Sequence, residues 1–167
     1  MEENCQHWYA LYTKPRHEKI VESELLQKNI EVFTPKIKLR RKWSDRIKIV
    51  EEPLFKSYCF ARFALDKKFP IVAQRGVVNI VNFNRNYVTV PISVIESLRA
   101  LLLNEVPVNP YPYLHLQDKI TITKGPLRGV EGYIVEKRNK DMSLVVSVDA
   151  IRSSIQCIVD VDCVEPA

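Results

Sequence analysis

Seven cationic residues fall within a stretch of thirteen, from Lys36 to Lys48, and only one acidic residue, Asp45, lies among them. The cations are Lys36, Lys38, Arg40, Arg41, Lys42, Arg46 and Lys48, and Trp43 is interleaved with them. Lys and Arg neutralise phosphates, and an interleaved aromatic ring can stack on an unpaired base. The segment therefore fits two interpretations, a nucleic-acid contact and a solvated charged hairpin, and its residues alone do not separate them.

The residues that carry catalysis or bind metals form no recognisable set. Cys5, Cys59, Cys157 and Cys163 are scattered without a Cys-x-x-Cys pair, and the three histidines complete no zinc spacing. A glycine-rich phosphate loop and a nucleophile elbow are also missing from the sequence. We therefore expect reduced, mostly buried thiols, no metal or other cofactor, and a protein that is not an enzyme.

Charge is unevenly distributed along the 167 residues, whose net charge is +5. Residues 1–105 carry 18 Lys/Arg and 12 Asp/Glu, whereas residues 106–167 carry 7 and 8. This asymmetry favours a polyanionic partner for the first part only. No apolar run approaches the roughly 20 residues that span a bilayer, and the acidic start lacks a signal peptide. We expect a cytoplasmic protein with no membrane contact.

The elements that must position these residues follow from periodicity and from chain breakers. Residues 8–13 predict a strand, Pro15 opens a helix that Asn29 ends, and 30–33 predict a second strand. The cationic segment reads as a hairpin with its tip near Ser44-Asp45. The expected elements that follow are a strand at 57–63, a short helix at 66–74 that Pro70 delays or splits, a strand at 77–83 and a helix at 91–103. This order predicts an α+β fold, a ferredoxin-like split βαβ domain with an added basic hairpin.

A proline-rich stretch marks the clearest domain boundary. Three prolines fall within residues 106–113, which favours an extended linker. The last ~50 residues then alternate like short strands (typically ~3–10 residues), at 119–123, 130–137, 144–148, 151–158 and 161–164. They predict a small five-stranded β-barrel. The expected organisation is an N-terminal domain at 1–105, a linker at 106–114 and a barrel at 115–167.

Three of the four glycines, Gly125, Gly129 and Gly132, cluster in the second part. We expect Gly125 to adopt a positive φ after the first barrel strand. We expect Gly129 and Gly132 to permit close backbone approach and sharp bending where the barrel closes. The segment 118–135 resembles the KOW motif in spacing and residue type. The motif implies a small barrel and a role in transcription or translation.

The N-terminal part resembles the NusG family of transcription factors. The resemblance rests on segments 8–12, 53–60, 75–78 and 90–92, and it extends over roughly residues 8–164. Residues 43–46 and 14–19 look most like the specialised RfaH and UpxY type. The resemblance implies NGN plus KOW domains and an elongation and antitermination factor for polysaccharide operons. It also implies that the protein suppresses pausing and termination.

In this family an aromatic patch grips the clamp helices of the largest subunit of RNA polymerase. The positions implied here are Tyr12, Phe55, Tyr58, Phe60, Phe83, Ile95 and Leu98. Strand alternation places Tyr58 and Phe60 on one sheet face, and helices of a split βαβ fold cover only the other face. An open aromatic face marks a partner surface. The alternative for each of these residues is an ordinary place in the core.

The resemblance also implies contacts with non-template DNA or nascent RNA. The candidate positions are Lys14, Arg16, His17, Arg40, Arg41, Lys42, Trp43, Arg46 and Arg75. Lys14, Arg16 and His17 form a cluster at the start of the first helix, and we expect Arg75 to lie near it. Two departures limit the comparison with RfaH. Pro15 replaces a basic residue, so the DNA preference should differ, and segment 64–74 is short and lacks the threonine-rich loop of a second polymerase contact.

Two further alternatives concern the second part. The KOW domain is expected to recruit a ribosomal protein or Rho, and the whole protein is expected to be a monomer. The alternative function is that of a ribosome-associated RNA-binding protein, which would have the barrel but no polymerase-binding patch. In RfaH the C-terminal region refolds as a helical cover. Here Val145, Val146, Val148 and the three glycines favour a barrel.

Overall fold

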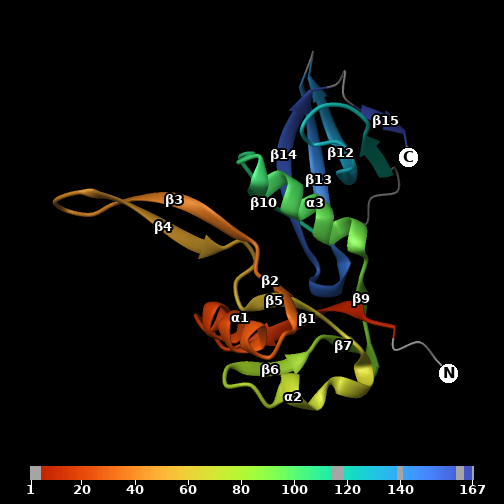
Figure 1. Cartoon of the computed structure of the whole chain (residues 1–167). Helices are drawn as coiled ribbons and strands as arrows, with labels where there is room; N and C mark the ends of the chain where they lie inside the picture. The colour runs from red at the N-terminus through yellow and green to blue at the C-terminus, as the bar shows by residue number, and fades with distance from the viewer. Residues whose placement is uncertain (1–4, 114–118, 139–140, 161–163, 167) are drawn as a thin grey trace. The chain divides into compact units, whose positions relative to one another are not determined.

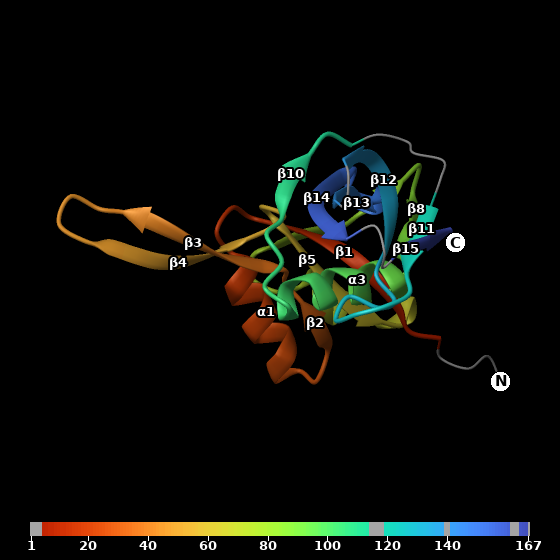
Figure 2. The same ribbon diagram turned by 90° about the horizontal axis from the view of Figure 1, so that it is seen from above.

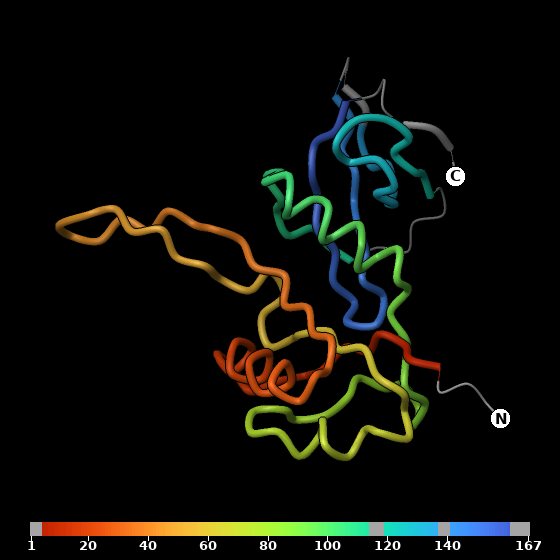
Figure 3. Tube along the Cα trace, in the orientation of Figure 1, coloured from red at the N-terminus to blue at the C-terminus, as the bar shows by residue number. Residues whose placement is uncertain are grey.

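The computed structural model describes residues 5–113, 119–138, 141–160 and 164–166 (Figures 1 and 3). It divides into two compact units, Met1–Thr89 and Val90–Ala167. Both contain sheet and helix, as the predicted mixed fold requires. In the part of the chain that the structure describes, no helix is long and apolar enough to cross a membrane.

The first unit is built on an antiparallel sheet with the strand order β2-β5-β1-β6. These strands are β1 (His7–Thr13), β2 (Glu31–Phe33), β5 (Tyr58–Phe63) and β6 (Val77–Ile80). The short β9 (Thr89–Val90) also pairs with β1. The aromatic and β-branched runs predicted to be strands therefore lie side by side in one sheet.

Helices cover one face of this sheet and form the core of the unit. They are α1 (Glu18–Gln27) and α2 (Phe69–Val72), and the short η1 (Leu65–Lys67) leads into α2. Val21 and Leu25 of α1 pack with Leu11, Cys59 and other buried side chains of the sheet. The alternation predicted for β5 is confirmed, because Cys59, Ala61 and Phe63 all belong to this core.

Helix α1 begins at Glu18, later than the start predicted at Pro15. Arg16 has a φ of +63°, a left-handed conformation that a right-handed helix cannot include. At the other end, Asn29 has a φ of +57° and closes the helix as predicted. Pro70 lies in the first turn of α2, where its missing N–H costs no helical hydrogen bond. The split predicted for segment 66–74 is therefore confirmed.

Two hairpins complete the first unit. The basic segment forms β3 (Lys36–Lys42) and β4 (Ile47–Pro53), joined by a tip at 43–46 as predicted (Figure 1). The strand predicted at 77–83 is instead divided into β6 and β7 (Asn82–Phe83). Strand β7 turns back through Asn84 and Arg85, which have φ values of +50° and +66°, to pair with β8 (Asn86–Tyr87). Two successive positive φ values suit a tight hairpin turn.

The second unit contains an antiparallel sheet with the order β10-β14-β13-β12-β11-β15. Its strands are β10 (Asn109–Tyr111), β11 (Lys119–Ile122), β12 (Glu131–Arg138), β13 (Asp141–Val148), β14 (Ser153–Asp160) and β15 (Val164–Pro166). The turn η2 (Asp149–Ile151) connects β13 to β14. Four of the five strands expected for this part are present at slightly shifted limits. The fifth was expected at 161–164, of which residues 161–163 lie outside the described residues and Val164 begins β15.

Part of the proline-rich stretch, which we predicted as an extended linker, pairs with the second sheet. Residues 109–111 form β10 and pair with β14, with Pro110 opposite Ile155. The backbone is extended, as prolines favour, and β10 is an edge strand of the sheet. Proline is tolerated at an edge because one side of the strand needs no donor.

The glycines of the second unit serve two different needs. A Cβ on Gly132 would lie 2.6 Å from the carbonyl oxygen of Val145, so the predicted close approach is confirmed there. Gly129 has open space around it but a φ of +90°, and Gly125 has a φ of +78°. Gly129 is therefore required for its backbone conformation, which fits the predicted sharp bend, and the close approach predicted for it is absent.

Helix α3 (Ile92–Leu103) belongs to the second unit by its contacts. It lies against β12 and β13, and Ile95, Leu98 and Leu101 are its fully buried apolar side chains. The buried hydroxyl of Ser97 donates to the carbonyl of Ser93 at 2.7 Å and accepts the backbone N–H of Glu131 at 2.9 Å. The sequence placed this helix in the N-terminal domain, and the limits 1–105, 106–114 and 115–167 stay a prediction.

Candidate partner and nucleic-acid surfaces

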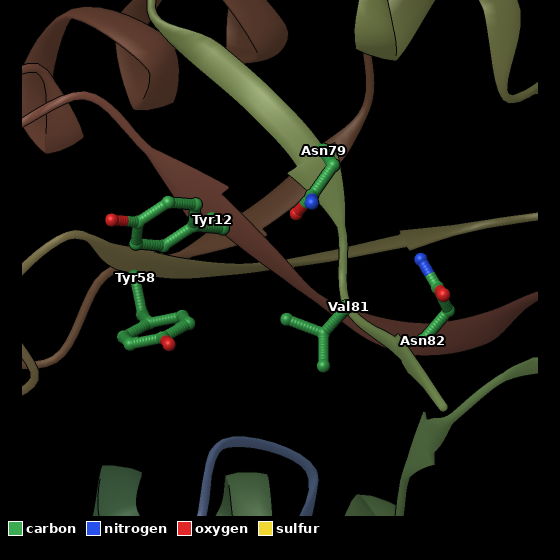
Figure 4. Close-up of a pocket in the computed structure, with 5 residues that line it drawn as sticks. All are labelled: Tyr12, Tyr58, Asn79, Val81 and Asn82. Carbon is green, nitrogen blue, oxygen red and sulfur yellow. The ribbon is translucent and has the colours of Figure 1, made fainter. Parts of the chain in front are cut away.

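Two tyrosines lie together on the sheet face that α1 and α2 leave uncovered. Tyr12 of β1 is directly opposite Tyr58 of β5, and their ring centroids are 5.4 Å apart. Tyr12 is 38% exposed, and Tyr58 is half-buried. The rings border an open hollow of about 320 Å³, which Asn79, Val81 and Asn82 complete (Figure 4). The hollow thus combines aromatic carbon with two amide groups that can hydrogen-bond to a partner.

A buried carboxylate holds the backbone just before Tyr58. Oε1 of Glu18, at the start of α1, accepts the backbone N–H of Ser57 at 2.7 Å. The carbonyl of Ser57 in turn accepts the N–H of Thr13 at 2.8 Å. Ser57 itself has a φ of +64°, which a serine adopts only at a cost. Sequence reasoning missed Glu18, because an acidic residue in the first turn of a helix usually needs no partner beyond the helix itself.

The other aromatic residues predicted for partner binding are placed differently. Phe60 is fully buried, with its ring centroid 6.2 Å from that of Phe55 and 6.4 Å from that of Phe33. Phe55 is also buried, so neither of these two rings is accessible in this structure. Phe83 follows Asn82 in β7 and is 41% exposed. The structure therefore places Tyr12 and Tyr58 together at the hollow. Phe83 is also accessible, and it directly follows Asn82, which lines the hollow.

Ile95 and Leu98, the remaining predicted contacts, lie in α3 of the second unit. Both are fully buried, and α3 packs on β12 and β13. Their periodicity in the sequence indicated an apolar helix face correctly. In this structure that face meets the chain's own sheet and is not accessible.

The β3–β4 hairpin projects as an arm from the sheet of the first unit (Figures 1 and 2). Its predicted nucleic-acid residues, which are Arg40, Arg41, Lys42, Trp43 and Arg46, are all exposed. At its base, cations are balanced by acids: Lys36 pairs with Glu22, and Lys19 lies 3.9 Å from Glu51. The base is thus tied to α1, and the excess positive charge lies toward the tip.

A second cluster of cations lies where α1 begins. The backbone N–H of Lys14 donates to the carbonyl of Gly76 at 2.8 Å, which brings Lys14 next to Arg75. A Cβ on Gly76 would lie 3.0 Å from the Cβ of His17, so this histidine packs against the same turn. Arg16 and Arg75 are exposed. The sequence predicted that Arg75 lies near the cluster of Lys14, Arg16 and His17, and this proximity is confirmed. These residues form one basic surface.

Thiols and acids provide no reactive centre in the described residues. Burial raises the pKa of Cys59 to about 12, and the nearby carboxylates of Glu22 and Glu18 add to this rise. Burial also raises the pKa of Cys157 to about 11. Both thiols are free, as is the exposed Cys5, whereas Cys163 lies outside the described residues. No group of His, Cys, Asp and Glu suited to a metal ion occurs in the described ranges.

Comparison with known proteins gives a family and a fold. The family model described as transcription termination factor NusG matches residues 6–99. The structure titled "Domain interaction in Thermotoga maritima NusG" is 19% identical, with a TM-score of 0.52 and coverage of 96% of this chain and 97% of that chain. A structure of the MjSpt4:Spt5 complex, conformation B, is 17% identical, covers 96% of each chain and has a TM-score of 0.33. Curated proteins yield no match.

Proposed function

Because the chain belongs to the NusG family of non-enzymatic transcription factors, we propose that it binds the clamp helices of the RNA polymerase largest subunit and acts in elongation and antitermination. The observation that carries this proposal is the Tyr12–Tyr58 pair, which lies inside the matched segment and borders an open hollow. Exposed aromatic side chains are enriched where protein partners dock.

The mechanism we propose is a shift in the populations of polymerase conformations. A factor that binds the closed clamp more tightly than the opened clamp stabilises the active form. Each 1.4 kcal/mol of preferential binding changes the ratio of the two forms about tenfold. Pausing and termination, which involve the opened form, would decrease accordingly.

Nucleic acid is the second partner in this proposal. The cations at the hairpin tip and the cluster of Lys14, Arg16, His17 and Arg75 would contact non-template DNA or nascent RNA. The accessible charge of both clusters supports this contact, because phosphate binding depends on Lys and Arg that are free to approach the backbone.

We also propose the finer features of the family for this chain. The first unit would be a ferredoxin-like NGN domain, and the second sheet would be a KOW barrel that recruits a ribosomal protein or Rho. The segments 14–19 and 43–46 support the specialised UpxY-like branch, which acts on polysaccharide operons.

The test is co-purification with RNA polymerase. Replacing both Tyr12 and Tyr58 by Ala removes the two rings that border the hollow, and we expect the retained polymerase to fall at least about tenfold, as for an interface hot spot. Leu26→Ala is the matched control, because Leu26 is exposed on α1, which covers the opposite face of the sheet. Undiminished retention of polymerase by the double variant would exclude this docking surface. Capture of ribosomal particles in place of polymerase would favour the ribosome-associated alternative.

A further inference from the structure

The two faces of the hairpin arm differ in chemistry. Arg41 is directly opposite Lys48, and Lys42 is directly opposite Ile47. The backbone N–H of Trp43 donates to the carbonyl of Arg46 at 2.8 Å, which extends the strand pairing by one step. Since alternate residues of a strand share a face, one face of the arm ends in Arg41, Trp43, Arg46 and Lys48, here called the tryptophan face. The other ends in Arg40, Lys42, Ile47 and Ile49, here called the isoleucine face.

The tryptophan face concentrates positive charge around an exposed ring. Trp43 is 57% exposed. Like charges directly opposite each other destabilise a strand pair, and Arg41 and Lys48 are such a pair. Glu52 moderates this repulsion, because its Oε1 accepts hydrogen bonds from Nε and Nη2 of Arg41 at 3.1 and 2.7 Å. Lys48 and Arg46 have no acidic partner among the described residues, so their charge is available to a ligand.

The isoleucine face has cations but no ring. Arg40 lies opposite Ile49 and Lys42 opposite Ile47, so each cation is paired with an aliphatic side chain. Both isoleucines are more than half exposed. Aliphatic side chains supply no flat π surface for a base. Each face therefore ends in two cations that have no acidic partner among the described residues. Only the tryptophan face also offers a ring on which a base can stack.

We propose that single-stranded nucleic acid binds along the tryptophan face, with a base stacked on Trp43 and adjacent phosphates held by Arg46 and Lys48. A stacked base must be unpaired, because the bases of a duplex already stack on one another, and aromatic platforms flanked by cations are the usual means of binding single strands. This inference rests on the proposed nucleic-acid contact of the arm. It adds Lys48 to that contact and removes Arg40 and Lys42 from its centre.

The test is a fluorescence titration of the full chain with a 12-nucleotide oligothymidylate. The chain has two tryptophans, and Trp8 is buried, so quenching on binding reports on Trp43. The Trp43→Ala variant lacks this signal, so its binding is measured with a fluorescently labelled oligonucleotide. We expect its affinity to be about tenfold weaker, from the loss of one stacked base. Oligouridylate and a 12-base-pair duplex distinguish RNA from DNA and single strands from double strands.

The matched comparison uses two double variants that each remove two cations. Arg46→Gln with Lys48→Gln alters the tryptophan face, and Arg40→Gln with Lys42→Gln alters the isoleucine face. The first should lower the slope of log affinity against log salt by about 1.4, from two lost phosphate contacts on a single strand. The second should lower it less, because its cations lie on the face without a ring. All four positions are exposed, and circular dichroism would verify the fold of each variant.

Three results would overturn the inference: equal losses in the two double variants, tighter binding of the duplex than of the single strand, or unquenched Trp43 in the wild-type complex. Binding of an acidic protein in place of oligonucleotide would also contradict it. Co-purification of polymerase with the same double variants separates this inference from the proposed function, since the Tyr12–Tyr58 surface is intact in both.

Discussion

Glu18 connects a helix start to the strand that carries Tyr58. The carboxylate is 5% exposed and accepts the N–H of Ser57, whose φ of +64° directs the chain into β5. A non-glycine residue in this region costs of order 1 kcal/mol or more, so the surrounding contacts must over-determine it. The residue that positions the tyrosine pair thus lies below the surface and contacts no partner itself.

Substitutions of Glu18 should separate its hydrogen bond from its charge. Glu18→Ala leaves the partly buried N–H of Ser57 without its acceptor, and we expect a loss of about 2–3 kcal/mol in the free energy of unfolding. Glu18→Gln retains a carbonyl oxygen at the same place and should lose about 1 kcal/mol, since a neutral acceptor is weaker than a charged one. Urea denaturation of the two variants measures both values. Equal losses would mean that the amide oxygen does not replace the carboxylate as acceptor.

At the scale of elements, helix α3 illustrates what periodicity predicts and what it does not. The spacing of Ile95 and Leu98 predicted a helix over 91–103 with one apolar face, and both features are present. The spacing does not identify the surface that this face meets, because apolar burial is not directional. The surface here is β12 and β13.

Leu98 and Leu103 allow the two roles of α3 to be distinguished. Leu98 is fully buried and Leu103 is 84% exposed in the same helix. Leu98→Ala should lower the free energy of unfolding by about 2–5 kcal/mol because it leaves a cavity. Leu103→Ala should change it by less than about 0.5 kcal/mol. Thermal unfolding followed by calorimetry checks this. If Leu98→Ala left stability unchanged but reduced polymerase retention, its main role would be partner contact.

Other elements show the same division between local and long-range information. The hairpin tip and the end of α1 at Asn29 follow from local signals, and sequence reasoning found both. The pairing of β10 with β14 and the anchor from Glu18 to Ser57 join residues far apart in the chain. Such contacts depend on the assembled sheet, so no local pattern reports them. The burial of Phe60 is a further example. Strand alternation shows which sheet face Phe60 points to, but not whether other residues cover that face.

At the scale of the whole molecule, α3 is assigned differently by sequence and by packing. The family match extends to residue 99 and so includes most of α3, whereas contacts group α3 with the second unit. Asn104, just after the helix, donates to the carbonyl of Pro126 at 3.2 Å, and Ser97 accepts the N–H of Glu131. Polar and apolar contacts thus agree that α3 contributes to the stability of the second sheet.

Two fragments should show how much the second sheet depends on α3 and β10. Residues 90–167 retain both elements, whereas 115–167, the predicted barrel, lacks them. Without α3 the apolar face of β12 and β13 is left uncovered, and without β10 the strand β14 becomes an edge. We expect the shorter fragment to unfold at least about 10 °C lower, since each kcal/mol lost shifts the midpoint of so small a domain by roughly 4–8 °C. Circular dichroism should show strand-rich spectra for both, and equal midpoints would instead support a linker at 106–114 and an independent barrel.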